Sequence, residues 1–374
     1  MSLFSKKTKG HLGIDFGAGG IKVVQLREIN GRGSLFTYGF SEFAPEETGL
    51  DYLENPERAG ALLKQICAKA KVTTTSACAA LPIPAVFSAV LSLAPMPKKD
   101  LPQAVQWEAK KLIPLPIEEV TLDFKELAPV KEEKQATVSG VAGAANGEKV
   151  ASAKKPEQKT IEVLLTAASK AIIEKYVKIA KVAGLTLASL ETEAFALIRS
   201  LQGSDPSAVV IVDMGAVRSN ILIVDRGIPM FTRSVEIGGK KCTEAIAASL
   251  GVPLAQAEAM KRDIGGAGFP GIAPGALPPI FAEVLEPLIN EIKYSFSIYK
   301  NRNGSETRLP EKIVLSGGGA GLPGLAEFLA GQFNIRTFLG NPWEHVNFQP
   351  DLQPVLHSFG SKFSVAIGLA MRNL

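Results

Sequence analysis

The sequence of 374 residues predicts an α/β fold of two related lobes, and two observations favour it. First, a strand-like apolar segment leads directly into a glycine-rich turn at three places, residues 13–22, 209–216 and 313–324. Second, the strands and hairpin of residues 12–40 recur at residues 209–237. A repeated strand–turn pattern with helical segments between its copies is typical of two fused halves that close on one site.

Aspartates stand at the end of the first two strands, Asp15 and Asp213. Glycine lets backbone N–H groups approach a phosphate, and a carboxylate can hold a hydrated divalent cation nearby. The same aspartates could instead cap their turns. Lys22 follows Asp15 closely and would either contact a phosphate as a point charge or lie solvated on its strand. We therefore expect a nucleotide phosphate site with Mg²⁺ at Asp15 and Asp213.

The remaining elements follow from hydrophobic periodicity. Alternation predicts strands at residues 12–16, 21–29, 35–40, 77–81, 86–93, 120–127, 161–166, 185–190, 209–214, 219–225 and 230–237. An apolar face at helical spacing predicts helices at residues 56–71, 100–111, 170–183, 193–201, 281–300, 322–331 and 363–374, and one that begins near residue 238. Pro114 and Pro116 end the helix of residues 100–111, and residues 265–279 are rich in Gly and Pro and predict a surface loop.

Composition changes sharply at residues 128–159. This segment is rich in Lys, Glu, Ala and Gly and has almost no large apolar side chains, so burial cannot offset its ordering entropy. Strand-like segments flank it on both sides. We expect a long flexible loop inserted within a hairpin.

Charge and cysteine content exclude several classes of site. The net charge is +4, and no Arg/Lys stripe carries interleaved aromatics, so nucleic acid is not an expected partner. The three cysteines and the three histidines are scattered and lack metal-ligand spacing. The cysteines are expected to be buried free thiols, which suits a reducing compartment. Residues 1–9 are basic without a long apolar stretch, which argues against a signal peptide; they predict a flexible tail or a weak membrane contact by Leu3 and Phe4.

The three turns resemble those of the actin, Hsp70 and sugar-kinase superfamily, in which the first two hold phosphates and the third faces the adenosine. Lys22 follows Asp15 at the spacing of actin's phosphate-contacting lysine. Ala18 stands where actin has a hydroxyl, and Val217 and Arg218 stand where the superfamily has Gly and Thr. These departures favour nucleotide binding with little hydrolysis, or a degenerate fold that no longer binds nucleotide.

A closer resemblance is to the PilM family of type IV pilus assembly proteins. Residues 107–124 are similar to that family's WEA…IPxPxEEVxLDF segment, and residues 162–168, 193–197, 316–320 and 368–372 are similar to it too. The resemblance runs from about residue 12 to the C-terminus, apart from residues 128–159. It implies an actin-like, ribonuclease H-like duplicated fold with an FtsA-type inserted subdomain.

The resemblance also implies a division of the chain. Residues 1–84 would begin lobe 1, 85–185 would form the inserted subdomain with its loop of residues 128–159, and 186–207 would be a connecting helix. Residues 208–345 would form lobe 2, and 346–374 would return to lobe 1. Trp107 would belong either to the core or to a peptide groove, with the core favoured, and Leu91 would line that groove.

The implied cofactors are ATP and Mg²⁺. The implied binding residues are Asp15, Gly17, Ala18, Gly19, Gly20, Lys22, Asp213, Gly215, Ala216, Arg218, Ser219, Asn220, Gly239, Lys241, Glu244, Gly317, Gly318, Gly319, Ala320 and Pro323. Several have plainer explanations: Arg218 could pair with a carboxylate, and a helix start accounts for Gly238, Gly239, Lys241 and Glu244 nearly as well. Glu193 would orient a water molecule for catalysis, although acidic residues are favoured at helix starts by the dipole alone.

The expected function is that of an ATP-binding scaffold, not an efficient enzyme, although slow ATPase activity fits the motifs. The resemblance implies a partner, the N-terminal cytoplasmic peptide of a PilN-like single-span membrane protein, together with other pilus platform and motor components. The chain would then be cytoplasmic, held at the inner face of the cytoplasmic membrane through that partner. The alternatives are an FtsA-like cell-division protein and a small-molecule kinase of the same superfamily.

Overall fold

The computed structural model describes residues 10–49, 53–127, 160–267, 276–302 and 309–374. The chain divides into two compact units, Met1–Val86 with Ala171–Leu374, and Phe87–Lys170. The loop predicted at residues 128–159, the tail of residues 1–9 and most of the loop predicted at residues 265–279 lie outside the described residues. The predicted subdomain boundaries at residues 85 and 185 stay a prediction.

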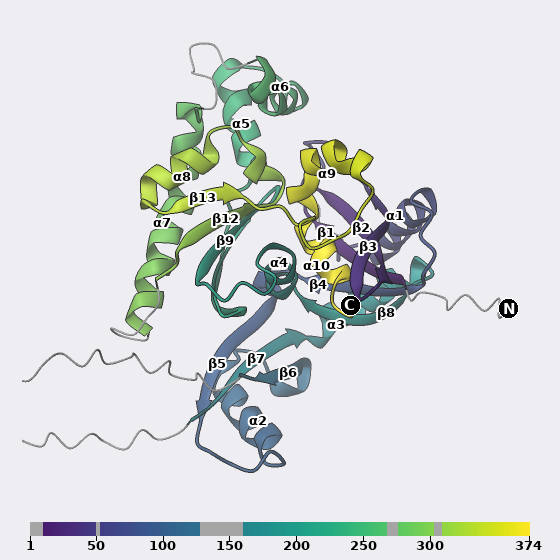
Figure 1. Ribbon diagram of the computed structural model, residues 1–374, viewed down its shortest axis with the longest axis vertical. Helices are drawn as coiled ribbons and strands as arrows, with labels where there is room; N and C mark the ends of the chain where they lie inside the picture. Colours follow the sequence, from purple (N-terminus) through teal and green to yellow (C-terminus); the bar gives the residue numbers. More distant parts are fainter. Residues whose placement is uncertain (1–9, 50–52, 128–159, 268–275, 303–308) are drawn as a thin grey trace, which may run out of the picture. The chain divides into compact units, whose positions relative to one another are not determined.

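Two five-stranded sheets form the first unit, and they share one strand order (Figure 1). The first sheet runs β3 (Arg32–Phe40), β2 (Gly20–Ile29), β1 (Gly10–Gly17), β4 (Ser76–Leu81) and β8 (Thr186–Thr192). The second runs β11 (Ile228–Val235), β10 (Ser219–Asp225), β9 (Val209–Met214), β12 (Lys312–Ser316) and β13 (Arg336–Leu339).

Strand directions match as well. In each sheet the first three strands are antiparallel neighbours, and the last two join in parallel. Asp15 pairs with Lys22 across β1 and β2, and Asp213 pairs with Asn220 across β9 and β10. The sheets therefore confirm the internal duplication that the sequence predicts. Because a strand-to-hairpin turn follows the same central strand in each sheet, the two turns are structurally equivalent.

The helices connect and cover these sheets. They are α1 (Pro56–Lys69), α3 (Lys170–Val182), α4 (Glu193–Leu201), α5 (Gly239–Leu250), α6 (Leu254–Ala267), α7 (Pro279–Arg302), α8 (Leu325–Phe333), α9 (Gln353–Phe359) and α10 (Ser364–Ala370). Short 3₁₀ turns stand at η1 (Ile83–Ala85), η4 (Gly318–Gly321), η5 (Pro350–Leu352) and η6 (Gly360–Phe363).

Local chemistry explains several helix ends. Asn55 caps α1, because its side chain accepts a hydrogen bond from the Arg58 N–H at 2.9 Å and proline follows at the first helical position. Gly251 ends α5 in the left-handed conformation, at φ 65°. The sequence did not predict α6, α9 or β13. The helix predicted at residues 322–331 begins three residues later, because η4 and Pro323 occupy the preceding turn.

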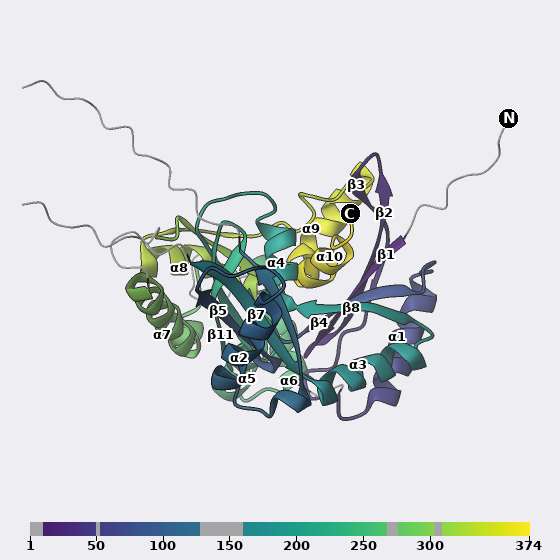
Figure 2. The same cartoon turned by 90° about the horizontal axis from the view of Figure 1, so that it is seen from below.

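The helices α4 and α10 lie side by side between the two sheets (Figures 1 and 2). Their buried side chains join those of β4, β9, β10 and β12 in one apolar cluster. A second cluster packs α5, α7 and α8 on the other face of the second sheet. A third packs β2 against Trp343 and the helices α9 and α10.

Arg199 of α4 binds Glu191 with both guanidinium nitrogens, at 2.8 and 3.0 Å, and also donates to the carbonyl of Gly368 in α10. These contacts tie α4 to β8 and to α10.

The second unit holds a three-stranded sheet of order β5 (Val86–Leu93), β7 (Ile161–Ser169) and β6 (Val120–Glu126). Its helix α2 (Leu101–Leu112) packs on the sheet through Leu101, Val105 and Ala109, and η2 (Ile117–Glu119) follows the helix. The strands β6 and β7 are antiparallel, which confirms the predicted hairpin around the inserted segment.

Two expectations about this unit are wrong. Trp107 is 61% exposed rather than part of the core, because it lies on the polar face of α2, where the Lys110 ammonium sits 5.4 Å from its ring centre. Leu91 is only 7% exposed and belongs to the apolar cluster of the unit, so it cannot line an open groove. Within the described residues, no helix has the length and apolar character needed to cross a membrane.

Candidate functional site

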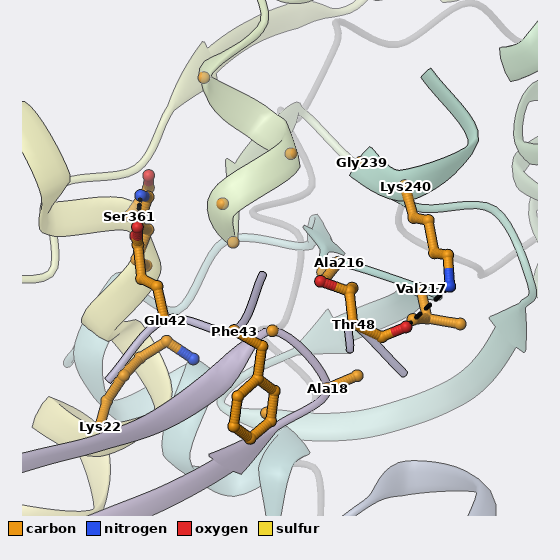
Figure 3. A pocket seen from close by; sticks show the side chains of 18 of the residues that line it. Ala18, Lys22, Glu42, Phe43, Thr48, Ala216, Val217, Gly239, Lys240 and Ser361 are labelled. Carbon is orange, nitrogen blue, oxygen red and sulfur yellow. Dashed lines mark hydrogen bonds and ion pairs between the residues drawn. The ribbon is translucent and has the colours of Figure 1, made fainter. Parts of the chain in front are cut away.

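A cavity of about 410 Å³ lies in the first unit, where the three glycine turns converge (Figure 3). One wall comes from the turn between β1 and β2, with Gly17, Ala18 and Gly19. The opposite wall comes from the turn after β9, with Gly215 and Ala216. The third side is η4 and the residues that follow it. The cavity is large enough for a small ligand such as a nucleotide.

Most of the predicted site residues line this cavity. They are Asp15, Gly17, Ala18, Gly19, Lys22, Glu193, Asp213, Gly215, Ala216, Arg218, Asn220, Gly239, Gly317, Gly318, Gly319 and Pro323. Five others do not reach it: Gly20, Ser219, Lys241, Glu244 and Ala320. Lys241 and Glu244 instead pair with each other on the surface of α5, at 2.9 Å. The three turns thus meet at one cavity, whereas Lys241 and Glu244 of α5 do not line it.

The first two turns approach each other closely. A Cβ atom built on Gly19 would lie 3.0 Å from the Cβ of Ala216. The third turn depends on Gly317, which has φ 85° and whose added Cβ would lie 2.3 Å from the carbonyl oxygen of Met214. Any L side chain there would be strained and would collide with the second turn. The three turns therefore present mainly backbone groups to the cavity, which suits an anionic ligand.

Acidic side chains gather at the bottom of the cavity. Asp15 is buried, at 6% exposure, and Lys22 Nζ lies 2.9 Å from its Oδ2 atom. Burial and the nearby charge of Asp15 raise the pKa of Asp213 to about 6, against hydrogen bonds from Ser316 and Asn220. Burial and the charges of Asp213 and Asp15 raise the pKa of Glu193 to about 7. Perturbed pKa values of this kind cluster at functional sites, so these carboxylates are candidates for one.

Hydrogen bonds fix the orientation of Glu193. Its Oε2 atom accepts from the Ile83 N–H and from Asn220 Nδ2, each at 3.1 Å. The Asn220 amide is itself held by Ser234, whose hydroxyl donates to Asn220 Oδ1 at 2.5 Å. Arg218 lines the same cavity, and its positive charge lowers the pKa of Glu193 in part. In the described part of the chain, no cluster of three or more His, Cys, Asp or Glu side chains has metal-binding geometry.

A further wall of the cavity, formed by α5 and α6, was not predicted from the sequence. Lys261 Nζ donates to the carbonyl of Gly239 at 3.0 Å and to Thr243 Oγ1 at 2.8 Å, and it pairs with Glu258 at 2.5 Å. These residues line the cavity together with Lys240 and Arg262. Glu258 and Lys261 are three residues apart, a spacing that brings side chains together only on a helix. Because α6 was not predicted, this spacing gave no sign that the two side chains meet.

Comparison with known proteins identifies the family. The family model described as "Type IV pilus assembly protein PilM" matches residues 13–155 and 149–374. The chain belongs to the PilM family. A solved PilM-PilN type IV pilus biogenesis complex contains a chain similar to this one, with 27% identity and a TM-score of 0.76, covering 97% of this chain and 98% of that chain.

More distant matches of this PilM-family chain bear on its fold. FtsA of Pseudomonas aeruginosa is 29% identical over 181 residues, a match that spans 44% of this chain and 42% of FtsA. MreB5 of Spiroplasma citri, solved with AMPPNP, has a TM-score of 0.50 at 13% identity, covering 97% of this chain and 95% of that chain. The fold is therefore the actin-like fold, as the sequence predicts, and the resemblance to the PilM family is confirmed.

Proposed function

We propose that this PilM-family chain binds Mg-ATP in the cavity and turns it over slowly. One observation carries the proposal: three glycine turns, Lys22 and the carboxylates of Asp15, Glu193 and Asp213 converge on one cavity of nucleotide size. Backbone N–H groups and Lys22 would bind the phosphates, which carry several negative charges. Asp15 and Asp213 would hold the water shell of Mg²⁺, which prefers oxygen ligands and keeps several waters.

The wall of α5 and α6 suits the sugar of the nucleotide. Glu258 presents carboxylate oxygens and Lys261 an ammonium group, and both side chains are mostly buried, at 19% and 13% exposure. Sugar hydroxyls both donate and accept hydrogen bonds, so such a pair can satisfy them. The glycine backbone of η4 leaves a flat wall on which a base could lie. When bound, Mg²⁺ would supply charge neutralisation between the phosphate oxygens.

Slow turnover follows from the groups near Glu193. Glu193 lines the cavity, where it could orient a water molecule. Because its pKa is about 7, only part of the Glu193 population is ionised at neutral pH. Ala18 supplies no hydroxyl to the phosphates, and Arg218 replaces a second hydroxyl with a bulky cation. The cavity thus has the charge for binding but few groups that would act only in the transition state.

We also propose a partner, the N-terminal cytoplasmic peptide of a PilN-like single-span membrane protein. The similar solved chain comes from a PilM-PilN complex and is matched along nearly all of both chains. In the second unit, Trp107, Leu112 and Leu115 are 61%, 45% and 47% exposed, which offers apolar side chains to a peptide. Through this peptide the chain would sit at the inner face of the cytoplasmic membrane with other pilus platform and motor components.

Calorimetry tests the nucleotide proposal directly. ATP should bind tightly with Mg²⁺ and more weakly when EDTA removes it, and mass spectrometry of the denatured supernatant should detect carried-over nucleotide. Absence of binding under both conditions would overturn the proposal. A panel of sugars and carboxylic acids tests the rival, a small-molecule kinase. Phosphoryl transfer to any of them at a rate well above that of ATP hydrolysis would favour that rival.

Fluorescence polarisation with a labelled peptide of the partner tests the second proposal. Binding should persist at high salt, because apolar burial would drive it. Trp107→Ala should weaken it, whereas Tyr294→Ala on α7, which removes an aromatic ring that is 49% exposed in the other unit, should not. Equal effects of the two substitutions, or loss of binding at moderate salt, would contradict the proposed peptide contact.

A further inference from the structure

A strap of residues 41–49 follows β3 and runs along the cavity. Ser41, Glu42, Phe43, Pro45 and Thr48 of this strap line the cavity, and Figure 3 shows Glu42, Phe43 and Thr48 beside it.

Backbone hydrogen bonds tie the strap to the first glycine turn. The N–H groups of Ser41, Phe43 and Gly49 donate to the carbonyls of Ile21, Gly19 and Ala18, at 2.9, 3.0 and 3.0 Å. Gly20 permits this contact, because it has φ 147° and its added Cβ would lie 1.8 Å from the carbonyl oxygen of Ser41. The strap and the first turn are therefore held together through their backbones.

Side chains tie the same strap to the second lobe. Arg262 Nη1 of α6 lies 3.0 Å from Glu42 Oε2, and Lys240 Nζ of α5 donates to the carbonyl of Thr48 at 2.8 Å (Figure 3). From the side of the first sheet, against which η6 packs through Phe363, Lys362 Nζ binds the other carboxylate oxygen of Glu42 at 2.8 Å. Burial raises the pKa of Glu42, but Lys362 and Arg262 outweigh it and hold that pKa below its ordinary value. The carboxylate therefore stays ionised near neutral pH.

Arg262 connects this contact to the proposed sugar site. Its Nε atom donates to Glu258 Oε1 at 2.9 Å, while Glu258 Oε2 accepts from Thr243 and Lys261, each at 2.5 Å. A continuous ionic chain thus runs from Lys362 through Glu42, Arg262 and Glu258 to Lys261. Lys362 and Lys261, which stand at the two ends of this ionic network, both line the same cavity.

We propose that the strap is a clasp between the lobes and that Glu42 is a positioning residue, which acts through Arg262 to hold Glu258 toward the sugar of the bound nucleotide. This inference rests on the proposed nucleotide site. Occupancy of the sugar position and closure of the strap then reinforce each other, as linkage requires. Because the strap lines the cavity and is bound to α5 and α6 on its far side, breaking the clasp should mainly speed release of the ligand.

The clasp should contribute little to the stability of the fold. The side chains of Arg262, Glu42 and Lys362 are 55%, 36% and 34% exposed, and exposed ion pairs add little to folding. A changed release rate at an unchanged melting temperature would therefore separate the clasp from a merely structural role.

The experiment measures release of tritium-labelled ADP, which avoids turnover, after a chase with unlabelled nucleotide. Glu42→Gln should speed release about 5- to 10-fold. Arg262→Gln should do the same, and the double variant should add little more, because both remove one coupling. The matched control is Glu47→Gln, which lies in the same strap but pairs at 3.6 Å with Arg58 of the first lobe. It should leave the release rate within about 2-fold.

A second nucleotide sharpens the test. With 2′-deoxy-ADP, which lacks one sugar hydroxyl, the effect of Glu42→Gln should shrink if Glu42 acts through Glu258. Equal release from Glu42→Gln and Glu47→Gln, full additivity in the double variant, or an undiminished effect on the deoxy nucleotide would each overturn the clasp while leaving the nucleotide site standing. Failure of the unchanged protein to bind ADP or ATP would instead overturn the nucleotide site and the clasp with it.

Discussion

Lys22 Nζ lies 2.9 Å from Asp15 Oδ2, and the two residues are directly paired across β1 and β2. Both were predicted to face a ligand, one as a phosphate contact and one in a magnesium shell. The structure shows them bound to each other at the wall of the cavity, at 18% and 9% side-chain exposure. Lys22 still has donors to spare, because an ammonium carries three, so the pair can meet a phosphate and a hydrated cation together.

Replacing Lys22 with alanine should weaken ATP binding by about 1.5–3 kcal/mol, roughly 10- to 100-fold, since it removes a charge-assisted contact. Titration calorimetry with Mg-ATP measures this. Lys241→Ala is the matched control, because Lys241 does not line the cavity and pairs with Glu244 on the surface. The control should bind ATP like the unchanged protein. Equal affinity of both variants would remove Lys22 from the phosphate site.

Glu193→Gln should stabilise the protein without nucleotide at alkaline pH. The pKa of Glu193 is about 7 in the folded chain and 4.5 as its ordinary value, so the folded state binds more protons between these limits. The free energy of unfolding of the unchanged protein therefore falls as pH rises through this window. Glutamine cannot ionise, and it should recover at most about 3 kcal/mol at about pH 8 and little at about pH 5.

Thermal unfolding with EDTA at both pH values measures this difference. Glu244→Gln serves as control, since Glu244 lies on the surface of α5 and does not line the cavity. A gain from Glu193→Gln that is the same at both pH values would show that the carboxylate is not strained by its neighbours.

Elements with a strong local hydrophobic pattern were predictable from the sequence, and elements with a weak pattern were not. The strands around Asp15 and Asp213 alternate strictly and end in glycine turns, so both hairpins and their duplication were predictable. The helix α6 was missed because its apolar side is made of small residues, such as Ala257, which give a weak periodic signal. For the same reason, Glu258 and Lys261 on α6 were not predicted to line the cavity.

Contacts between distant segments could not be predicted from local patterns. Glu42 meets Arg262 and Lys362 only after the lobes have folded, across 220 and 320 residues of chain. The orientation of α2 was also beyond the sequence. Trp107 and Val105 both suit a buried face, and only the packing of Val105, Leu101 and Ala109 on the sheet decides that Trp107 faces outward.

Leu91 and Trp107 should respond in opposite ways to truncation. Leu91→Ala should lower the stability of the protein by about 2–5 kcal/mol, because a buried leucine leaves a cavity in the cluster of the second unit. Trp107→Ala should change stability by less than about 0.5 kcal/mol, as exposed substitutions do. Urea unfolding followed by far-UV circular dichroism measures both. A large loss from Trp107→Ala would mean that its ring supports the fold.

Residues 130–158, which follow β6 and precede β7 in the sequence, should be replaceable by a short Gly/Ser link without loss of stability. The two strands are antiparallel up to Glu126 and Val163, and the Leu127 N–H donates to the carbonyl of Glu162 at 2.8 Å, so the ends that the link must join are already held together. The entropy of closing a loop changes slowly with its length, by only about 0.6 kcal/mol for each doubling, so shortening should leave the melting temperature unchanged or slightly raised.

A Gly/Ser link of the original length controls for the loss of sequence at constant length. Differential scanning calorimetry and ATP titration should give the same values for both variants and for the unchanged chain. If both links lower the melting temperature, the replaced residues themselves contribute to the fold, and if only the short one does, the strand ends need the longer span.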